Sequence, residues 1–439
     1  MIPQGYYINQ FGNTQPWPAG APVNIVNGKQ TGGIPGLYYV PSGFLGDANS
    51  STIMFSSERT FSGDTTVKEG FTEFNIPLLK DIPGIQTLST DLAARWANYS
   101  GSGNVWAWKA GIDWAFNDSL RLRATRSRDV RAASLEERFD TTRGGVTVRN
   151  SFLPTAPNQS GASYSGGNPS LAPEEADTWT AGLVFTPTFL QGFSASIDWY
   201  KITINDAIDQ PTAQQVVDAA ARGDPQYTPL VVLDAGKNII EVDRFFINFA
   251  QQFVAGVDFE AAYRTSVHLF GGGPEDIALR LYATDLMKNA TLTQFGSYDE
   301  WAGQVGTARS LPKHKYNLNV TYSNGPYSLF VQGRYISDGI LDHTLIQSDV
   351  AIIGANGLPV SNTINNNHVG GLFYMDLNLQ YAVPVPTGDF SVYGEVQNVF
   401  DRAPPSTPAA YGRTGSLSTN PQLYDVLGRR YQIGLRYRF

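Results

Sequence analysis

Histidine and carboxylate side chains are the first candidates for chemistry in this sequence, because both bind metal ions. The four histidines stand singly in turn-like or loop-like segments: His268, His314, His343 and His368. His343 and His368 share one long connection, so a paired metal site is conceivable there, although solvated loop histidines are the commoner arrangement. Asp285, Asp299 and Glu300 could offer oxygen ligands to calcium, but scattered acidic loop residues usually form only a hydrated surface. We therefore expect no metal site.

Other side chains could contact a ligand without changing it. Tyr298, Trp301 and Tyr411 stand in connections and could stack on a sugar or on an aromatic ligand, and packing between loops explains them equally well. Four charged residues stand in strand-like segments: Arg121, Arg123, Arg334 and Glu395. These charges could steer a substrate, but they could also line a water-filled wall and neutralise one another. A substrate-binding set is therefore unknown at this stage.

Catalytic and cofactor motifs are missing from the sequence. It contains no G-x-S-x-G elbow, no phosphate-binding G-x-x-x-x-G-K-[ST] loop, no H-E-x-x-H and no EF-hand pattern. With no cysteine among the 439 residues, thiolate metal sites, disulfides and cysteine nucleophiles are excluded. Two carboxylates across a cleft would suit glycoside hydrolysis, but the sequence does not establish such a pair. We expect no enzyme, no catalytic residue and no cofactor.

The composition narrows the class of protein. The formal net charge of −8 argues against a nucleic-acid partner, which would require a basic face. Charged residues make up 16% of the chain, below the roughly 25% of ordinary soluble domains, and aromatic residues make up 12%. No apolar run approaches the 18 or so residues of a spanning helix. The composition therefore indicates a large, aromatic-rich chain that is neither a nucleic-acid-binding protein nor a protein with membrane-spanning helices.

Alternation of apolar and polar residues with a period of two is the dominant pattern, and it predicts β-strands. In the last nine residues, one face carries Tyr431, Ile433, Leu435, Tyr437 and Phe439. Thirteen such strands are expected, over residues 67–77, 86–98, 105–116, 119–127, 176–186, 192–202, 253–268, 276–287, 315–323, 326–336, 371–381, 388–398 and 431–439. Only residues 213–222 predict a helix.

Bulky aromatic residues begin and end the apolar face of strand after strand, as with Trp106 and Phe116 or Phe193 and Trp199. Amphipathic rings prefer the headgroup level of a bilayer, and two aromatic girdles flank the apolar band of a membrane barrel. Eight residues tilted by roughly 40° span on the order of 20 Å, close to the band's height of about 25 Å. The opposite face carries charged residues and fits a wet lumen. The prediction is an all-β, antiparallel transmembrane barrel rather than a soluble sandwich or propeller.

Short turns alternate with long polar connections, which supports the barrel. The short turns are at 81–84, 117–118, 187–191, 271–274, 323–326 and 384–388, and the long connections are 128–175, 203–252, 288–314, 337–370 and 399–430. Outer-membrane barrels have short periplasmic turns and long extracellular loops. Residues 239–250 also alternate, and we expect them to extend a strand beyond the membrane. Residues 1–66 are loop-like, which predicts an extracellular loop followed by a barrel portion over residues 67–439.

Three motifs resemble the TonB-dependent receptors of the Gram-negative outer membrane. Residues 120–139, a strand and the loop after it, are similar to the family's S-R-x-x-R-A-P-S-L-x-E-L-F stretch, with Ala133 where the family usually has proline. Residues 168–178 resemble its N-P-x-L-x-P-E element, which leads into the next strand. Residues 397–401 and 424–431, followed by a final strand that closes on Phe439, resemble the family's C-terminal end. The three motifs follow the family's order over residues 120–439.

The resemblance implies a barrel of about 22 strands with a plug domain in its lumen. Thirteen strands are an odd number, and barrels of this kind have an even number, so we expect this chain to be the C-terminal portion, without plug, TonB-contacting box or export signal. Its implied partners are outer-membrane lipid, the outer-membrane assembly machinery, TonB through the missing plug, and a ligand of the siderophore, cobalamin or oligosaccharide class.

The last strand is expected to carry an assembly signal, and two alternative functions stay open. The alternation of Tyr431, Ile433, Leu435, Tyr437 and Phe439 resembles the signal by which the assembly machinery recognises a final strand. A passive porin-like barrel is the first alternative function, and a soluble carbohydrate-binding β-protein is the second. An outer-membrane importer fragment without covalent chemistry is the interpretation that we favour.

Overall fold

The computed structural model describes residues 6–8, 14–16, 25–26, 29–30, 62–153, 158–270, 275–306, 310–354, 360, 362–407 and 418–439. The chain divides into two compact units. The first consists of residues 1–65, 134–170 and 210–246, and the second of residues 66–133, 171–209 and 247–439. The second unit holds the large sheet, and the first is built mainly from two of the long connections.

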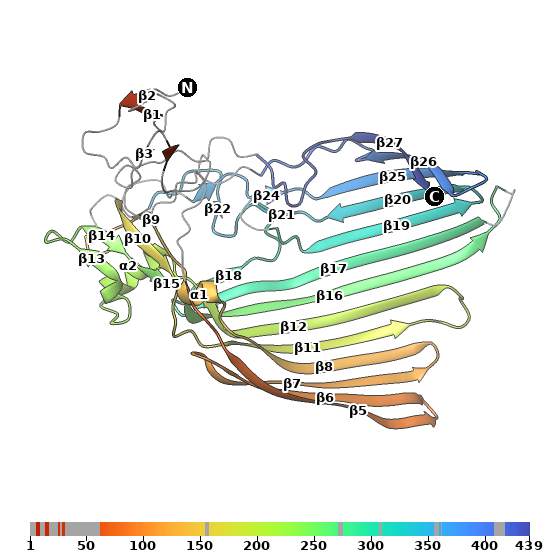
Figure 1. Ribbon diagram of the computed structural model, residues 1–439, viewed down its shortest axis with the longest axis horizontal. Coiled ribbons are helices and arrows are strands. Elements are labelled where there is room, and N and C mark those ends of the chain that lie inside the picture. Colours follow the sequence, from red (N-terminus) through yellow and green to blue (C-terminus); the bar gives the residue numbers. More distant parts are fainter. Residues whose placement is uncertain are drawn as a thin grey trace. The chain divides into compact units, whose positions relative to one another are not determined.

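The large sheet contains thirteen consecutive antiparallel strands, each hydrogen-bonded to the next (Figure 1). In order they are β5 (Val67–Ile82), β6 (Ile85–Tyr99), β7 (Gly103–Asn117), β8 (Leu120–Arg131), β11 (Glu174–Phe185), β12 (Phe193–Asp209), β16 (Ile247–Val267), β17 (Glu275–Thr293), β19 (His314–Asn324), β20 (Tyr327–Ile336), β25 (Leu372–Val383), β26 (Asp389–Gln397) and β27 (Arg430–Arg438). A short strand, β18 (Tyr298–Glu300), pairs with β17. All thirteen predicted strands are confirmed.

Several strands run farther than the sequence pattern predicts. β12 continues to Asp209, β16 begins at Ile247, and β17 continues to Thr293. Their added residues lie at the ends that carry the long connections, where β12, β16 and β17 stay paired beyond the aromatic positions. The predicted bounds are too short because apolar alternation fades where both faces of a strand are polar, although the backbone ladder continues.

The two faces of the sheet differ in the way the alternation predicts. On one face, large apolar side chains project outward and are exposed, among them Trp106 (61%), Trp179 (52%) and Leu435 (69%). Soluble monomers rarely expose so much contiguous apolar surface. This face therefore requires an apolar surrounding such as lipid. The other face carries charged residues such as Arg123, Asp198 and Asp376. Among the described residues, no helix is long and apolar enough to cross a membrane.

Tight turns join the strands at the end of the sheet where the C-terminus lies (Figure 1). Two residues with positive φ form the bend from β5 to β6, Asp81 (55°) near the end of β5 and Gly84 (79°) in the turn itself. Between β7 and β8, the Asn117 side chain accepts hydrogen bonds from the backbone amides of Ser119 and Leu120. The turns predicted at 323–326 and 384–388 are confirmed by the strand bounds, and the turn predicted at 271–274 lies outside the described residues.

The connections at the other end contain short elements of their own. In the second unit these are β21 (Gly339–Ile340) with β24 (His368–Val369), and β22 (Ile346–Gln347) with β23 (Thr363–Ile364). In the first unit, hairpins join β1 (Tyr6–Ile8) to β2 (Thr14–Pro16) and β3 (Ile25–Val26) to β4 (Lys29–Gln30). These two hairpins lie in the segment predicted to be loop-like.

The first unit also contains a five-stranded sheet with helices. Its elements are α1 (Leu135–Phe139), β9 (Thr141–Val148), β10 (Gln159–Gly166), α2 (Ala213–Ala221), the 3-10 turn η2 (Thr228–Leu230), β13 (Val231–Leu233), β14 (Ile239–Val242) and β15 (Arg244–Phe245). The predicted helix at 213–222 is confirmed as α2, which Thr212 caps and which buries Val216 and Val217. Helix α1 was not predicted, because five residues are too short to show a helical period.

One prediction about this region is wrong. Residues 239–250 were expected to form a single strand extension, but only Ile247 onward belongs to β16. β14 and β15 instead pair in parallel with β10 in the small sheet. The alternation is real, and it marks strands, but the pattern within a strand says nothing about which partner the strand will pair with.

Candidate functional site

The polar face of the large sheet is lined by ion pairs that cross between strands. Arg123 on β8 binds Asp198 on β12, with its Nη2 atom 2.8 Å from Oδ2. The strand between them, β11, places Gly182 in register with both residues. A Cβ atom at Gly182 would overlap the Asp198 carboxylate, so the missing side chain is what allows the bridge to pass over β11.

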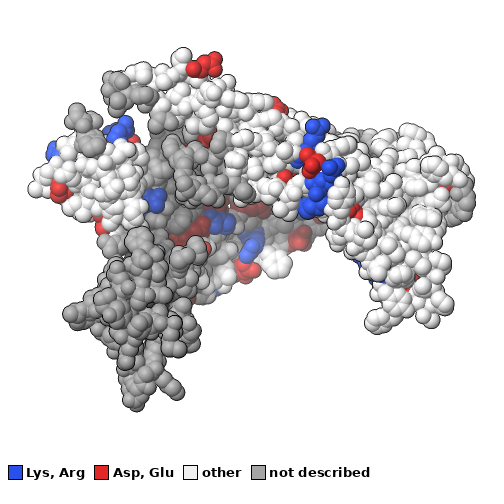
Figure 2. Space-filling model, turned by 90° about the horizontal axis from the view of Figure 1, so that it is seen from above, with Lys and Arg blue, Asp and Glu red and all other residues white. Residues whose placement is uncertain are grey.

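The other strand charges singled out in the sequence are also engaged. Arg121 binds Asp113 on the neighbouring strand β7, and Arg334 on β20 lies 3.1 Å from Asp376 on β25. Glu395 accepts a hydrogen bond of 2.6 Å from Gln397. For the three arginines the structure supports charges that are neutralised along the wall, because each is paired with a carboxylate, whereas the partner of Glu395 is a neutral amide. In Figure 2, blue and red side chains lie next to one another in several places, while others stand singly.

His343 joins two of the long connections. Its Nε2 atom is 3.1 Å from Oδ1 of Asp299, and its Nδ1 atom is 2.9 Å from Oε1 of Gln304. Gln304 Oε1 also accepts the backbone amide of His343, so this oxygen fixes both the loop and the ring. The ring meets Trp301 edge to face, with centroids 4.1 Å apart. His343 and Trp301 therefore pack one loop against another, and neither is presented to solvent as an isolated loop residue.

The remaining histidines and carboxylates are spread over different places. His368 lies 3.3 Å from Asp338, and His314 lies 3.5 Å from Asp285 on the outward face of β17 and β19. Glu300 accepts the backbone amides of Asn289 and Ala302, which makes it a loop-shaping residue. His268 directly follows β16. Within the part of the chain that the structure describes, no group of three or more His, Cys, Asp or Glu residues could hold a metal ion.

The two other aromatic candidates have different outcomes. Tyr298 on β18 is half exposed, and the Lys288 amine lies 5.4 Å from its ring centroid. The ring of Tyr298 therefore contacts the Lys288 amine by a cation–π interaction. Tyr411 lies outside the described residues. Tyr298 is therefore the one predicted stacking residue that the structure places with substantial exposed surface among those it describes.

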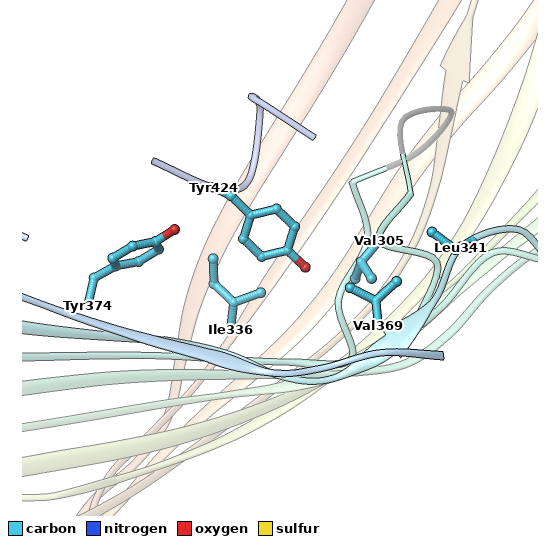
Figure 3. Packing of buried hydrophobic residues seen from close by; sticks show 6 residues of the cluster. All are labelled: Val305, Ile336, Leu341, Val369, Tyr374 and Tyr424. Atoms are coloured by element: carbon cyan, nitrogen blue, oxygen red, sulfur yellow. The ribbon is translucent and has the colours of Figure 1, made fainter. Parts of the chain in front are cut away.

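An apolar cluster that the sequence did not reveal holds three long connections together (Figure 3). Its buried members are Val305, Ile336, Leu341, Val369, Tyr374 and Tyr424. Val305 belongs to the β17–β19 connection, Leu341 to the β20–β25 connection and Tyr424 to the β26–β27 connection. The Tyr374 hydroxyl accepts the Asp425 amide at 3.0 Å, and Asn420 donates to the carbonyl of Gly306 at 2.8 Å. These residues are far apart in sequence, so no local pattern could have found the cluster.

The final strand presents the predicted assembly residues as a continuous outward row. β27 pairs with β26, with Tyr437 opposite Phe390 and Leu435 opposite Val392. Exposure is 83% for Ile433 and complete for Phe439. The Tyr437 hydroxyl donates to the carbonyl of Thr387 at 3.1 Å, which ties the end of the strand to the preceding turn. The geometry makes the row accessible, and its role as an assembly signal stays a prediction.

Comparison with known proteins was made on sequence and on structure. Residues 4–399 match the family model described as TonB dependent receptor-like, beta-barrel. No curated protein matches the sequence. Among solved structures, the siderophore receptor PirA from Acinetobacter baumannii is similar with a TM-score of 0.56 and 16% sequence identity, over 86% of this chain and 47% of that one.

A second similar structure is a variant of the ferric enterobactin receptor PfeA from Pseudomonas aeruginosa in complex with enterobactin. It has a TM-score of 0.56 and 15% identity, over 84% of this chain and 45% of that one. Identities this low establish the shared fold alone. This chain spans less than half the length of either structure. Because the family model covers most of the sequence, and because the sheet has the strand order, turn pattern and faces of a membrane barrel, the chain belongs to the TonB-dependent receptor β-barrel family of the Gram-negative outer membrane.

Proposed function

We propose that this chain is the C-terminal part of an energised importer that takes up a siderophore. The match of residues 4–399 to the receptor barrel family carries the proposal. Siderophore, cobalamin and oligosaccharide receptors share this scaffold. We choose the siderophore class because the similar solved structures are named as a siderophore receptor and a ferric enterobactin receptor.

The arrangement of the polar face supports a lumen wall along which the ligand passes, rather than a wall that binds the ligand. Arg123 with Asp198 and Arg334 with Asp376 neutralise each other, which leaves a hydrated surface without a strong net field along these strands. Recognition then belongs to the connections, where Tyr298, Trp301 and the His343 contacts gather at the outer ends of β17, β19 and β20. Release into the periplasm would depend on a plug moved by TonB, as the family implies.

The transport step in this proposal makes and breaks no covalent bond. The family consists of receptors and transporters, and the ligand would leave chemically unchanged. Both edges of the sheet, β5 and β27, pair with one neighbour each among the described strands. Open edges are not tolerated in hydrocarbon. We therefore propose that about nine further strands close the barrel, which gives the 22 or so strands of plugged transporters.

Uptake by intact cells tests this proposal. The complete receptor gene would be expressed in cells that lack their own siderophore receptors, and the uptake of radioactive iron supplied as ferric siderophores would be measured with and without TonB. We expect uptake that requires both the receptor and TonB. The matched control is the same receptor with a TonB-contacting segment deleted, which should bind the ferric siderophore but not import it.

Two results would overturn parts of the proposal separately. Iron uptake that continues without TonB would identify a passive porin-like barrel. TonB-dependent uptake of labelled cobalamin or of an oligosaccharide, without uptake of any ferric siderophore, would keep the importer and replace the ligand class.

A further inference from the structure

Three basic side chains, from strands β8 and β12, stand on the lipid-facing side of the sheet among tryptophans of β7 and β11. Arg126 on β8 lies in register with Trp179 on β11, and Trp179 lies in register with Lys201 on β12. Arg128 lies in register with Trp108 on β7. Residues in register share a face of the sheet. These cations therefore stand among the exposed tryptophans, on the side opposite to the Arg123–Asp198 bridge.

Two of the three cations are held in fixed positions. The Arg126 guanidinium carbon lies 5.6 Å from the ring centroid of Trp108 and 4.9 Å from that of Trp179, so the group is sandwiched between two indoles. Its Nη2 atom is 2.9 Å from Asp177. Arg128 binds Asp177 at 3.2 Å and Glu175 at 3.0 Å. A charged group stacked and paired in this way cannot turn away from the membrane surface.

The third cation is available to a ligand. The Lys201 side chain is exposed, and its amine has no hydrogen bond or ion pair within the described residues. Three cations face two carboxylates, Asp177 and Glu175, which leaves a positive charge in excess on a chain whose net charge is −8. Arg128 uses its Nε, Nη1 and Nη2 atoms on these carboxylates, and each of its two Nη atoms has a second N–H, so both Lys201 and Arg128 can donate outward.

The depth of Lys201 in the bilayer indicates which part of the lipid its amine meets. Lys201 is eight residues from the start of β12 at Phe193, which corresponds to roughly 26 Å along the strand and to about 20 Å across a membrane at a tilt near 40°. Trp199, two residues earlier, is part of the outer aromatic girdle. A lysine at this depth extends its amine to the headgroups. The long connections place this end of β12 on the outer side.

We propose that the outward basic patch, defined as Arg126, Arg128, Trp179 and Lys201, binds a phosphate group of a phosphorylated glycolipid in the outer leaflet. Charge complementarity selects the occupant, because lipid phosphates are the anions that meet this surface. Lys201 and Arg128 donate to the phosphate oxygens, while Trp179, between Arg126 and Lys201, packs against the adjoining acyl and sugar carbons. The bound lipid becomes part of the boundary of the barrel at β8, β11 and β12.

The test uses the complete receptor in nanodiscs that contain trace amounts of lipid A, either bisphosphorylated or enzymatically dephosphorylated. Binding would be measured by native mass spectrometry. Near a membrane surface one basic residue typically changes affinity about fivefold. We expect the Lys201→Gln variant to hold the phosphorylated lipid about fivefold more weakly, Lys201→Arg to restore it, and the dephosphorylated lipid to bind every variant equally poorly.

Lys109→Gln is the matched control, because Lys109 on β7 is an exposed lysine on the opposite, polar face. It should bind the lipid as the unchanged receptor does. Correct folding of each variant is checked by its heat-modifiable gel mobility. Equal binding by Lys201→Gln and the unchanged receptor would overturn the proposal. An equal loss in Lys109→Gln, or equal binding of the dephosphorylated lipid, would also overturn it.

Discussion

Gly182 shows how one residue without a side chain decides a contact between two others. It lies in register between Arg123 and Asp198, and the bridge between them crosses above its Cα atom. In a strand, glycine often marks such a close approach. Sequence alone identifies Arg123 and Asp198 as polar-face residues, but their pairing across an intervening strand depends on register and on this glycine.

Replacing Gly182 by alanine should break the bridge and keep the strand. The added methyl would displace only the ends of two flexible side chains, so the cost is that of a partly exposed ion pair, about 0.2–1 kcal/mol of unfolding free energy. Urea unfolding of the receptor in vesicles, followed by tryptophan fluorescence, measures it. The control is Gly394→Ala on β26, where a Cβ atom meets nothing within 4 Å. An equal effect of the two substitutions would contradict the assignment.

The two tyrosines of the loop cluster should respond differently to loss of their hydroxyls. The Tyr374 hydroxyl accepts the Asp425 amide, so Tyr374→Phe should cost about 0.5–1.5 kcal/mol. The Tyr424 hydroxyl is buried without a hydrogen-bond partner among the described residues, so Tyr424→Phe should be neutral or stabilising. Hydrogen exchange of the β26–β27 connection distinguishes them, and greater loosening by Tyr424→Phe would be the contrary result.

Tyr424 also predicts a response to alkaline pH. Burial raises the pKa of its phenol to about 12, above the value near 10 of a tyrosine in an unfolded chain. The folded loops keep the phenol neutral while the open form ionises, so their stability is full below pH 10 or so and falls as the pH rises toward 12. The Tyr424→Phe variant should show a smaller loss over this range.

At the scale of elements, the sequence predicts the long strands with a repeating apolar pattern and misses the elements within the long connections. A period of two over eight or more residues found all thirteen strands, because each has one face in lipid and one in water. Helix α1 and strand β13 have only five and three residues and so carry too few periods to be recognised, and β9, with eight residues, lacks a regular apolar alternation. The contact of His343 with Asp299 joins residues 44 positions apart, and only the tertiary fold brings them together.

The last strand gives a prediction at this scale. β27 ends at Arg438, and the next residue, Phe439, is fully exposed at the end of an apolar row that includes Leu435 and Tyr437. Deleting Phe439 from the complete receptor should lower the amount of assembled barrel in the outer membrane, because the terminal aromatic is the proposed recognition feature. Quantitative immunoblotting of outer-membrane fractions measures this. Phe439→Tyr should preserve assembly, and unchanged levels after deletion would remove the signal interpretation.

At the scale of the whole molecule, the sheet formed by the described strands has two edges, and β5 is exposed along its full length. Unpaired backbone groups cannot be left in hydrocarbon. We therefore expect the 439-residue chain, expressed on its own, to show no heat-modifiable shift on an unheated gel, the sign of a closed barrel. The complete receptor is the positive control. A clear shift by the isolated chain would show that it closes without further strands.

The apolar cluster around Val305, Leu341 and Tyr424 has a consequence for engineering. Three connections share one interior, so exchanging any one of them with the corresponding loop of a relative would leave a void or a clash inside the other two. Chimeric receptors made to alter ligand choice should therefore exchange the three as a set. If only one of these loops were exchanged, a loss of ligand binding caused by disrupted loop packing could not be told from a change in ligand preference.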